Sequence, residues 1–229
     1  MEYPHNRPYT ADDLVRIITL LRDPVDGCPW DKVQTHTSIR MNFLEEAYEA
    51  VDALDLDDPV LMCEELGDVL MQVAFHTCME QETGRFTWEQ VCDGVCQKLI
   101  ERHPNIFGTQ PGYEGITDWD ALKNKEKGRR TLADDLESVP RAMPALMRAA
   151  KLQKRAARHG AALQGADAAA LADAAENLQT AQPASAQAEQ AVGKLLFAAA
   201  NLARQAGVDP EQALQKANEA FCTAAGPVA

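Results

Sequence analysis

Two groups of acidic residues with the same spacing lie close together in the first third of the chain. The first group has the pattern E-E-x-x-E and the second has the pattern E-E-x-x-D. From residue 41 to residue 84 the sequence holds twelve Asp or Glu residues and no Lys or Arg. Basic neighbours in sequence therefore cannot neutralise these carboxylates, which are Glu45, Glu46, Glu49, Glu64, Glu65 and Asp68.

The spacing within each group suits a divalent cation. Glu46 and Glu49 are three residues apart, so on a helix they share one face with Cβ atoms about 5–6 Å apart. Glu65 and Asp68 have the same spacing, and two antiparallel helices could bring all four carboxylates together. Hard oxygen ligands at this density favour Mg²⁺ or Mn²⁺, which take further ligands from substrate phosphates. The pattern predicts a metal-dependent enzyme that acts on a phosphorylated substrate.

A simpler interpretation is that both helices carry solvated acidic faces. It is reasonable for Asp52, Asp55, Asp57 and Asp58, which we expect on the surface. It is poor for Asp68, because its sequence neighbours are apolar and an unpaired charge among them would cost several kcal/mol. A di-iron centre is a weaker alternative, since it needs Glu-x-x-His pairs that these two helices lack.

Cations and aromatic side chains that could hold a nucleotide occur further along the chain. Lys98 and Arg102 are one helical turn apart, and Lys123 follows Trp119 by one turn. Each cation could equally lie on an ordinary solvated face. Trp30 and Trp119 could stack on a base or could be core residues.

Apolar residues at helical spacing, together with capping signals, predict the elements that position these groups. Thr10 and Thr87 are expected N-caps, Pro59 fits a first turn, and Gly84 fits a helix end. We find no convincing strand, and predict an all-α fold of antiparallel helix pairs. The expected helices cover residues 10–22, 38–56, 59–82, 87–103, 119–127, 143–158, 167–179, 186–206 and 210–224. Helix 59–82 should be buried on most sides between Leu66 and Cys78, where nearly every residue is apolar.

A weak internal repeat divides the chain. Residues 66–74 align with residues 192–200, and the second copy has Ala191 and Lys194 where the first has Glu65 and Asp68. The polar stretch 128–141, which contains Pro140, is the expected boundary. We predict a catalytic repeat at residues 1–138 and a second, degenerate repeat at residues 139–229.

Composition limits the partners and the compartment. The net charge of −13 argues against non-specific binding to nucleic acid or to an anionic membrane. No run is long and apolar enough to span a bilayer, and the N-terminus lacks the apolar segment of a secretory signal. The six cysteines show no C-x-x-C spacing, so we expect free thiols in a reducing cytoplasm.

Several motifs together resemble the MazG-type nucleoside triphosphate pyrophosphohydrolases. They are the acidic pattern, Gly27-Cys28-Pro29-Trp30-Asp31, residues 98–104 (KLIERHP) and residues 140–146 (PRAMPAL). The resemblance implies tandem all-α MazG repeats, which form a four-helix-bundle type of assembly as a homodimer. It implies Mg²⁺-dependent hydrolysis of NTPs or dNTPs to the monophosphate and pyrophosphate, a house-cleaning role in the nucleotide pool.

The resemblance also assigns roles to individual residues. Carried over by motif position, the metal ligands would be Glu46, Glu49, Glu65 and Asp68. Glu45 or Glu64 would orient or deprotonate the attacking water. The residues that would face the triphosphate or nucleotide are Lys98, Arg102, Trp119 and Lys123.

The second repeat departs from the family pattern. Ala191 and Lys194 replace acids, and Ala220 and Ala224 replace the cations that match Lys98 and Arg102. Catalysis is therefore expected in the first repeat, with the second as a structural or dimerising part. The alternative hypothesis is a non-catalytic protein that binds nucleotide or metal, or that mediates assembly.

Overall fold

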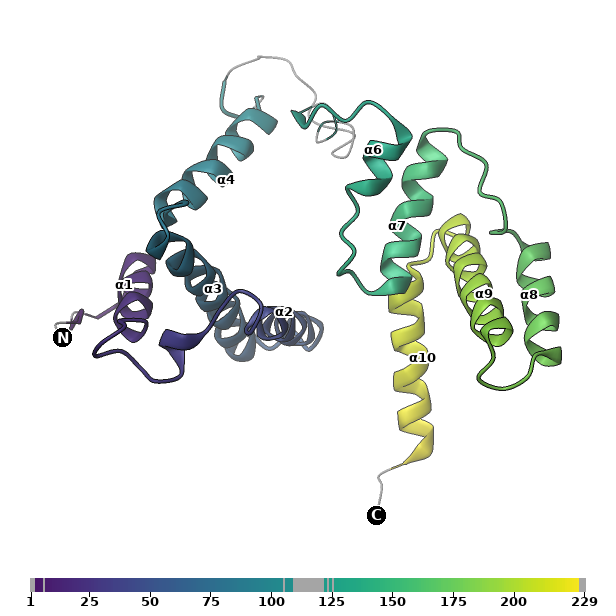
Figure 1. Ribbon diagram of the computed structural model, residues 1–229, viewed down its shortest axis with the longest axis horizontal. Helices are drawn as coiled ribbons and strands as arrows, with labels where there is room; N and C mark the ends of the chain where they lie inside the picture. The colour runs from purple at the N-terminus through teal and green to yellow at the C-terminus, as the bar shows by residue number, and fades with distance from the viewer. Residues whose placement is uncertain are drawn as a thin grey trace. The chain divides into compact units, whose positions relative to one another are not determined.

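The chain folds into two compact units, residues 1–116 and residues 117–229 (Figure 1). The computed structural model describes residues 3–5, 7–104, 106–108, 122, 124 and 126–226. Throughout these residues all regular secondary structure is helical, which confirms the predicted all-α fold. No helix among them is both long and apolar enough to cross a membrane.

Where the first unit is described, it contains four α-helices and one short 3₁₀ turn. The elements are α1 (Ala11–Leu21), η1 (Asp31–Val33), α2 (Arg40–Asp55), α3 (Pro59–Glu82) and α4 (Trp88–Arg102). The three-residue connection between α2 and α3 forces these two helices to pack side by side as an antiparallel pair. This pair carries both acidic groups.

The predicted capping signals set where these helices begin. Thr10 accepts a hydrogen bond from the backbone N–H of Asp13, whose carboxylate accepts from the backbone N–H of Thr10. Thr87 and Gln90 form the same reciprocal box at the start of α4. Asp58 caps α3, with Pro59 in its first turn. These side chains satisfy backbone donors that have no partner within the helix.

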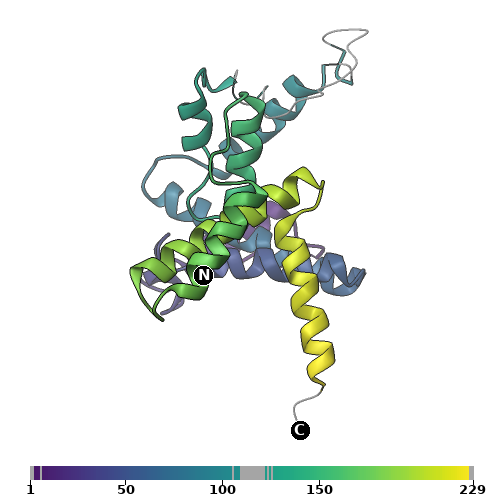
Figure 2. The ribbon, with the colours of Figure 1, turned by 90° about the vertical axis from the view of Figure 1, so that its right-hand side faces the viewer.

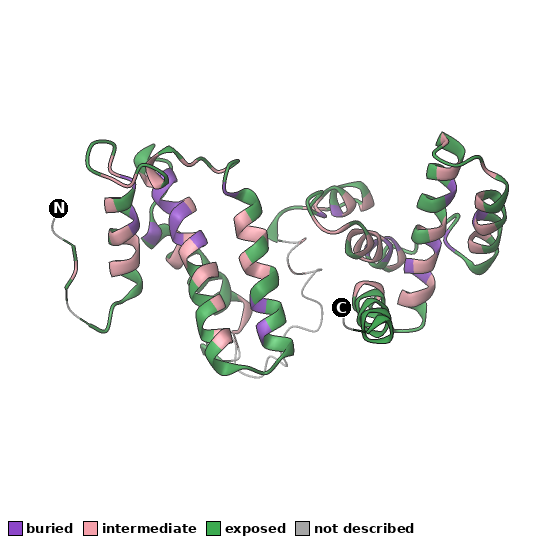
Figure 3. Ribbon diagram, turned by 90° about the horizontal axis from the view of Figure 1, so that it is seen from below, coloured by how far each residue is buried: buried purple, intermediate pink, exposed green. Residues whose placement is uncertain are grey.

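The core of this unit gathers around the C-terminal half of α3 (Figure 3). Ile18 of α1, Phe75 and Met79 of α3, and Trp88 of α4 belong to one buried apolar cluster. The residues that are buried in this cluster are Ile18, Ile39, Ala74, Phe75, Cys78, Met79 and Trp88. The expectation that α3 is buried on most sides is confirmed only for this half.

The N-terminal half of α3 is more open than predicted. Leu66 keeps 51% of its surface exposed and Leu70 keeps 39%. The sequence prediction was wrong here because α2 covers only one side of this half of the helix within the unit. The apolar neighbours of Asp68 thus do not bury its carboxylate, which is partly exposed.

A buried arginine fastens the segment between α1 and α2 to the end of α3. Arg22 is 8% exposed, and its guanidinium donates to both carboxylate oxygens of Glu82, at 2.5 and 2.8 Å. The same group donates to the backbone carbonyls of Asp31 and Gln34. The segment that carries Trp30 therefore has a fixed attachment to α3.

The second unit contains five helices in its described part. They are α6 (Leu132–Glu137), α7 (Ala145–Arg158), α8 (Ala168–Thr180), α9 (Ala186–Gln205) and α10 (Pro210–Ala225). Helices α8 and α9 lie side by side, as α2 and α3 do in the first unit (Figure 2). This agrees with the predicted alignment of residues 66–74 on α3 with residues 192–200 on α9.

Helix α6 corrects the interpretation of residues 128–141 as a polar connection. Asp135 on α6 is 1% exposed and pairs with Arg155 of α7 at 2.9 Å. Arg155 also donates to the backbone carbonyl of Asp135 and to the hydroxyl of Ser138. Helix α6 therefore belongs with the second unit, and the division at residue 116 falls before the proposed boundary at 138. The helix predicted at residues 119–127 lies mostly outside the described residues.

Candidate metal centre

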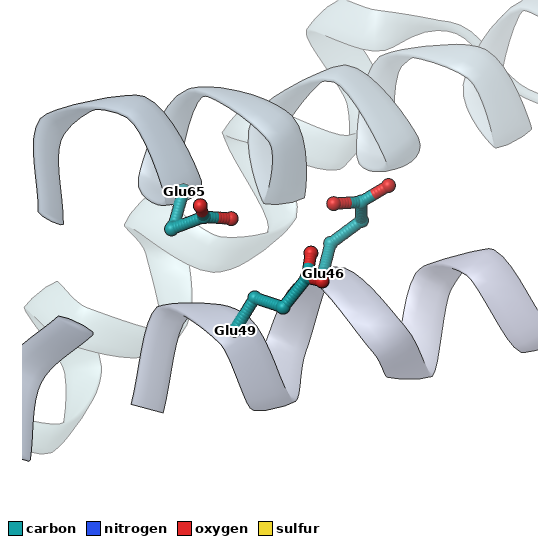
Figure 4. Close-up of side chains that lie close together, drawn as sticks. All are labelled: Glu46, Glu49 and Glu65. Atoms are coloured by element: carbon teal, nitrogen blue, oxygen red, sulfur yellow. The ribbon is translucent and has the colours of Figure 1, made fainter. Parts of the chain in front are cut away.

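Three of the four predicted metal ligands converge in the space between α2 and α3 (Figure 4). Glu46 and Glu49 extend from consecutive turns of α2, and Glu65 extends from the facing side of α3. One carboxylate oxygen from each residue lies within 4.8 Å of the others. Glu46 and Glu65 are partly buried and Glu49 is exposed, so the group opens to solvent on one side.

The electrostatics of this acidic cluster are unfavourable without a cation. Burial raises the pKa of Glu46, and the nearby charges of Asp68 and Glu49 raise it further. Burial also raises the pKa of Glu65, with the same two neighbours adding to the shift. None of the three carboxylates forms an ion pair with a Lys or Arg within the described chain. The mutual repulsion is what a divalent cation would remove.

Asp68, Glu45 and Glu64 lie near the cluster but are not members of it. Asp68 lies close enough to act on the charges of Glu46 and Glu65, but it is not within the 4.8 Å group. Glu45 and Glu64 are exposed on the same two helices. Each raises the pKa of its neighbour in the cluster, so both lie beside it.

Gln72 is a member of the site that the sequence interpretation did not assign. It is 7% exposed, and its Nε2 donates to Oε1 of Glu46 at 3.4 Å. Its Oε1 is buried and has no hydrogen-bond partner. The signal was its position four residues after Asp68, on the same stripe of α3.

The donor set fits a hard divalent cation. Three carboxylates from two helices supply oxygen ligands, with Asp68 close by for a fourth, and one side stays open for water or phosphate oxygens. This is the ligand chemistry of Mg²⁺ and Mn²⁺, which retain waters and bind substrate phosphate. Gln72 would hold Glu46 in orientation from behind.

Three of the five predicted substrate-binding residues lie within the described part of the chain. Trp30 is 56% exposed on the segment that Arg22 anchors. Lys98 is exposed and Arg102 is partly buried, both on the second half of α4. Trp119 and Lys123 lie outside the described residues.

The corresponding place in the second unit has different chemistry. Ala191 is buried at the position that matches Glu65, and Lys194 is exposed at the position that matches Asp68. A groove of about 1400 Å³ between α8 and α9 is lined by residues that include Asp173, Glu189 and Lys194. Within the described residues, the cluster on α2 and α3 is the one group of three potential metal ligands.

Comparison with known proteins points to one family. Residues 34–107 match the MazG nucleotide pyrophosphohydrolase domain. The chain is 41% identical over 219 residues to the nucleoside triphosphate pyrophosphohydrolase of Escherichia coli (strain K12), an alignment that covers 92% of this chain and 83% of the relative. It is 39% identical over 212 residues to the Thermotoga maritima protein named nucleoside triphosphate pyrophosphohydrolase/pyrophosphatase MazG, with 92% and 82% covered. A Mycobacterium tuberculosis nucleoside triphosphate pyrophosphohydrolase is 34% identical over 154 residues, with 66% and 46% covered.

Proposed function

The chain belongs to the MazG family of nucleoside triphosphate pyrophosphohydrolases, and we propose that it cleaves nucleoside triphosphates to the monophosphate and pyrophosphate with Mg²⁺. The observation that carries this proposal is the convergence of Glu46, Glu49 and Glu65 without a Lys or Arg counterion in the described residues. Each of these carboxylates raises the cost of ionising the others, and a bound cation would remove that cost.

The residues of the site have separate roles in this proposal. Glu46, Glu49, Glu65 and Asp68 would hold the cation, which when bound neutralises phosphate charge and lowers the pKa of a bound water. Glu45 or Glu64, exposed beside the cluster, would orient or deprotonate the attacking water. Water adds to phosphorus, the anhydride bond between the α- and β-phosphates breaks, and pyrophosphate leaves.

We further propose that substrate phosphates and base meet residues outside the cluster. Lys98, Arg102 and Lys123 would offer positive charge to the triphosphate, and Trp30 and Trp119 would offer faces for stacking. The support for Trp30 is its exposure on an anchored segment. The support for Lys98 and Arg102 is their spacing of one turn on α4.

Catalysis is proposed to rest in residues 1–138, since the second unit has Ala191 and Lys194 where the first has acids. A homodimer is proposed because α2 and α3 expose apolar side chains that a second copy could cover, among them Tyr48, Val51, Leu66 and Leu70. A cytoplasmic location is proposed because all six cysteines are unpaired.

The proposal is tested by incubating the purified protein with each common NTP and dNTP, with Mg²⁺ and with EDTA in place of Mg²⁺. Monophosphate and pyrophosphate should appear in equal amounts, and only with the metal. The exposed cation Lys194 in the second unit leaves one other candidate, a protein that binds nucleotide without cleaving it. That function would show Mg²⁺-dependent nucleotide binding in the same samples with no product.

A further inference from the structure

A second polar cluster lies further along α3, one turn beyond Gln72. His36, which precedes α2, lies parallel to His76 of α3, with ring centroids 5.0 Å apart and planes 6° apart. The Nδ1 atoms of the two rings are 2.7 Å apart, a hydrogen-bond distance. Phe43 of α2 meets His76 edge-on, at 5.7 Å between ring centroids. His76 therefore lies against the same helix that carries Glu46.

The outer nitrogen of His36 has a fixed role. Its Nε2 is 2.6 Å from Oε1 of Glu80, a side chain that is buried in α3. Arg85 donates to both oxygens of the same carboxylate, at 2.6 and 2.7 Å. A carboxylate held by a guanidinium is ionised and can only accept hydrogen bonds. His36 must therefore carry a proton on Nε2.

The proton on Nε2 of His36 in turn determines which nitrogen of His76 is protonated. When His36 is neutral its Nδ1 has no proton, so the short contact requires His76 to donate from its own Nδ1. A neutral His76 then has an unprotonated Nε2, which can only accept. Burial lowers the pKa of His76, which favours its neutral form, and the neighbouring His36 acts in the same direction against the weaker effect of Glu80.

Protonation of His36 would reverse the arrangement without charging His76. A doubly protonated His36 donates from Nδ1, so His76 must accept there and carry its proton on Nε2. The Nε2 atom of His76 thus changes from acceptor to donor. Within the described part of the structure this atom has no hydrogen-bond partner.

His76 lies on the same stripe of α3 as the proposed metal ligands. Glu65, Asp68, Gln72 and His76 follow one stripe of α3, and the rise of 1.5 Å per residue places His76 about 12 Å beyond Asp68 along the axis. In the other direction the stripe continues with Leu61 and Met62, which offer no polar group. If phosphates occupy the acidic cluster, the polar end of the stripe is where the nucleoside can meet hydrogen-bonding partners.

We propose that His76 is a specificity-determining residue that accepts a hydrogen bond from a hydroxyl or amino group of the nucleoside, with its acceptor state set by His36, Glu80 and Arg85. This inference rests on the proposed function, because it assumes that phosphates occupy the acidic cluster. The unsatisfied Oε1 of Gln72, one turn earlier, is a second acceptor on the same stripe.

Nitrogen-15 NMR of histidine side chains in the wild-type protein tests the acceptor state directly. At pH 8 we expect His76 to be protonated on Nδ1 and His36 on Nε2. Addition of Mg²⁺ and an α,β-methylene nucleoside triphosphate, which cannot be cleaved at that bond, should shift the His76 Nε2 signal. The opposite tautomers at pH 8, or no shift of this signal at saturating nucleotide, would overturn the proposal.

His76→Phe keeps a ring but removes both nitrogens. Its kinetics identify the nucleoside group to which His76 binds. Loss of one hydrogen bond should lower kcat/KM about tenfold for nucleotides that carry the donor, relative to those that lack it. Ribo- against deoxyribonucleotides test the sugar hydroxyl, and amino-bearing against amino-free bases test the base. In His36→Asn, which removes the ring that fixes the tautomer of His76, this preference should weaken. His5→Asn, at an exposed N-terminal site, should match wild type.

An equal effect of His76→Phe on every nucleotide would overturn the specificity role. If wild type cleaves no nucleotide, the proposed function fails. The NMR titration still decides whether His76 meets bound nucleotide. The two failures are therefore distinguishable.

Discussion

Each carboxylate of the acidic cluster raises the cost of ionising its neighbours, and this coupling makes the role of a single residue measurable. Glu49 is the exposed member, yet its charge raises the pKa of both Glu46 and Glu65. A bound dication would convert the same proximity from repulsion into chelation. Removing one charge should therefore have opposite consequences with and without metal.

Glu49→Gln should keep or slightly raise stability without metal, because it removes like-charge repulsion. It should lower Mg²⁺ affinity at least tenfold, since a charged ligand is lost. The measurement is the shift of the unfolding midpoint with Mg²⁺ concentration, which reports binding to the folded state. Asp55→Asn, an exposed acid later on the same helix, is the matched control and should respond like wild type. An unchanged Mg²⁺ response in Glu49→Gln would remove Glu49 from the metal centre.

The raised pKa of Glu46 predicts a pH dependence of known sign. Between its ordinary value of 4.5 and the raised value, folded Glu46 holds a proton that the unfolded chain has released. The free energy of unfolding of the metal-free protein should therefore fall as pH rises above about 4.5, through this group. Urea unfolding of wild type and Glu46→Gln across pH 4 to 7 isolates the effect. The difference in stability between the two proteins should shift in favour of the variant as pH rises, and a difference that is constant with pH would contradict the account.

At the scale of elements, local sequence predicted the helices well. Every expected helix in the described residues begins and ends within two residues of its observed counterpart, because caps such as Thr10, Asp58 and Thr87 act over three or four residues. Helix α6 was missed although Thr131 and Asp134 form a capping box at its start, because its six residues are too few to show an apolar stripe. The contact that buries Asp135 comes from Arg155, twenty residues away. The exposure of Leu66 was missed because periodicity shows which face is apolar, but not whether another helix covers it.

For the site as well, local spacing predicted some contacts, and others depend on how the helices pack. Spacing predicted that four carboxylates would meet, because two short intervals on adjacent helices fix their faces. Glu46, Glu49 and Glu65 do so, and Asp68 lies outside their 4.8 Å group. The link between His36 and His76 joins residues forty apart and has no local pattern. The bond from Gln72 to Glu46 likewise appears only once α2 and α3 are packed.

Helix α6 gives a prediction about the second unit. Burial opposes ionisation of Asp135, but hydrogen bonds with Asn124 and His159 and the charge of Arg155 hold its pKa below the ordinary value. Asp135→Asn would leave Arg155 buried without its counterion, which typically costs about 3–5 kcal/mol. Urea unfolding should show this loss, whereas Glu137→Gln, exposed on the same helix, should unfold like wild type. Equal stabilities would mean that the ion pair does not hold α6 in place.

At the scale of the whole molecule, the two units repeat one helix-pair arrangement with different chemistry. The first pair holds the acidic cluster, and the second holds Ala191 and Lys194 at the matching positions. The metal-binding part of the proposed activity should therefore depend on the first unit alone.

A fragment of residues 1–138 cuts α6 from its partner Arg155 on α7. It should still retain Mg²⁺ binding, because α2 and α3 carry all the proposed ligands. It should also retain nucleotide cleavage if it still assembles as the full chain does, so its size in solution must be measured in parallel. The same fragment with Glu49→Gln is the control for site-specific activity. A folded fragment of the native oligomeric state that is inactive, beside an active full chain, would place an essential part of catalysis in the second unit.

The most direct test of the central claim combines metal, nucleotide and cluster in one assay. Full-length wild type and Glu49→Gln would be incubated with the NTP and dNTP panel and Mg²⁺, and monophosphate and pyrophosphate would be quantified. We predict equal amounts of both products from wild type, none with EDTA, and a rate at least a hundredfold lower in Glu49→Gln, on the order of 3 kcal/mol of lost transition-state stabilisation. Cleavage that persists in EDTA, or that proceeds equally fast in folded Glu49→Gln, would show that the carboxylates of α2 and α3 are not the catalytic metal centre.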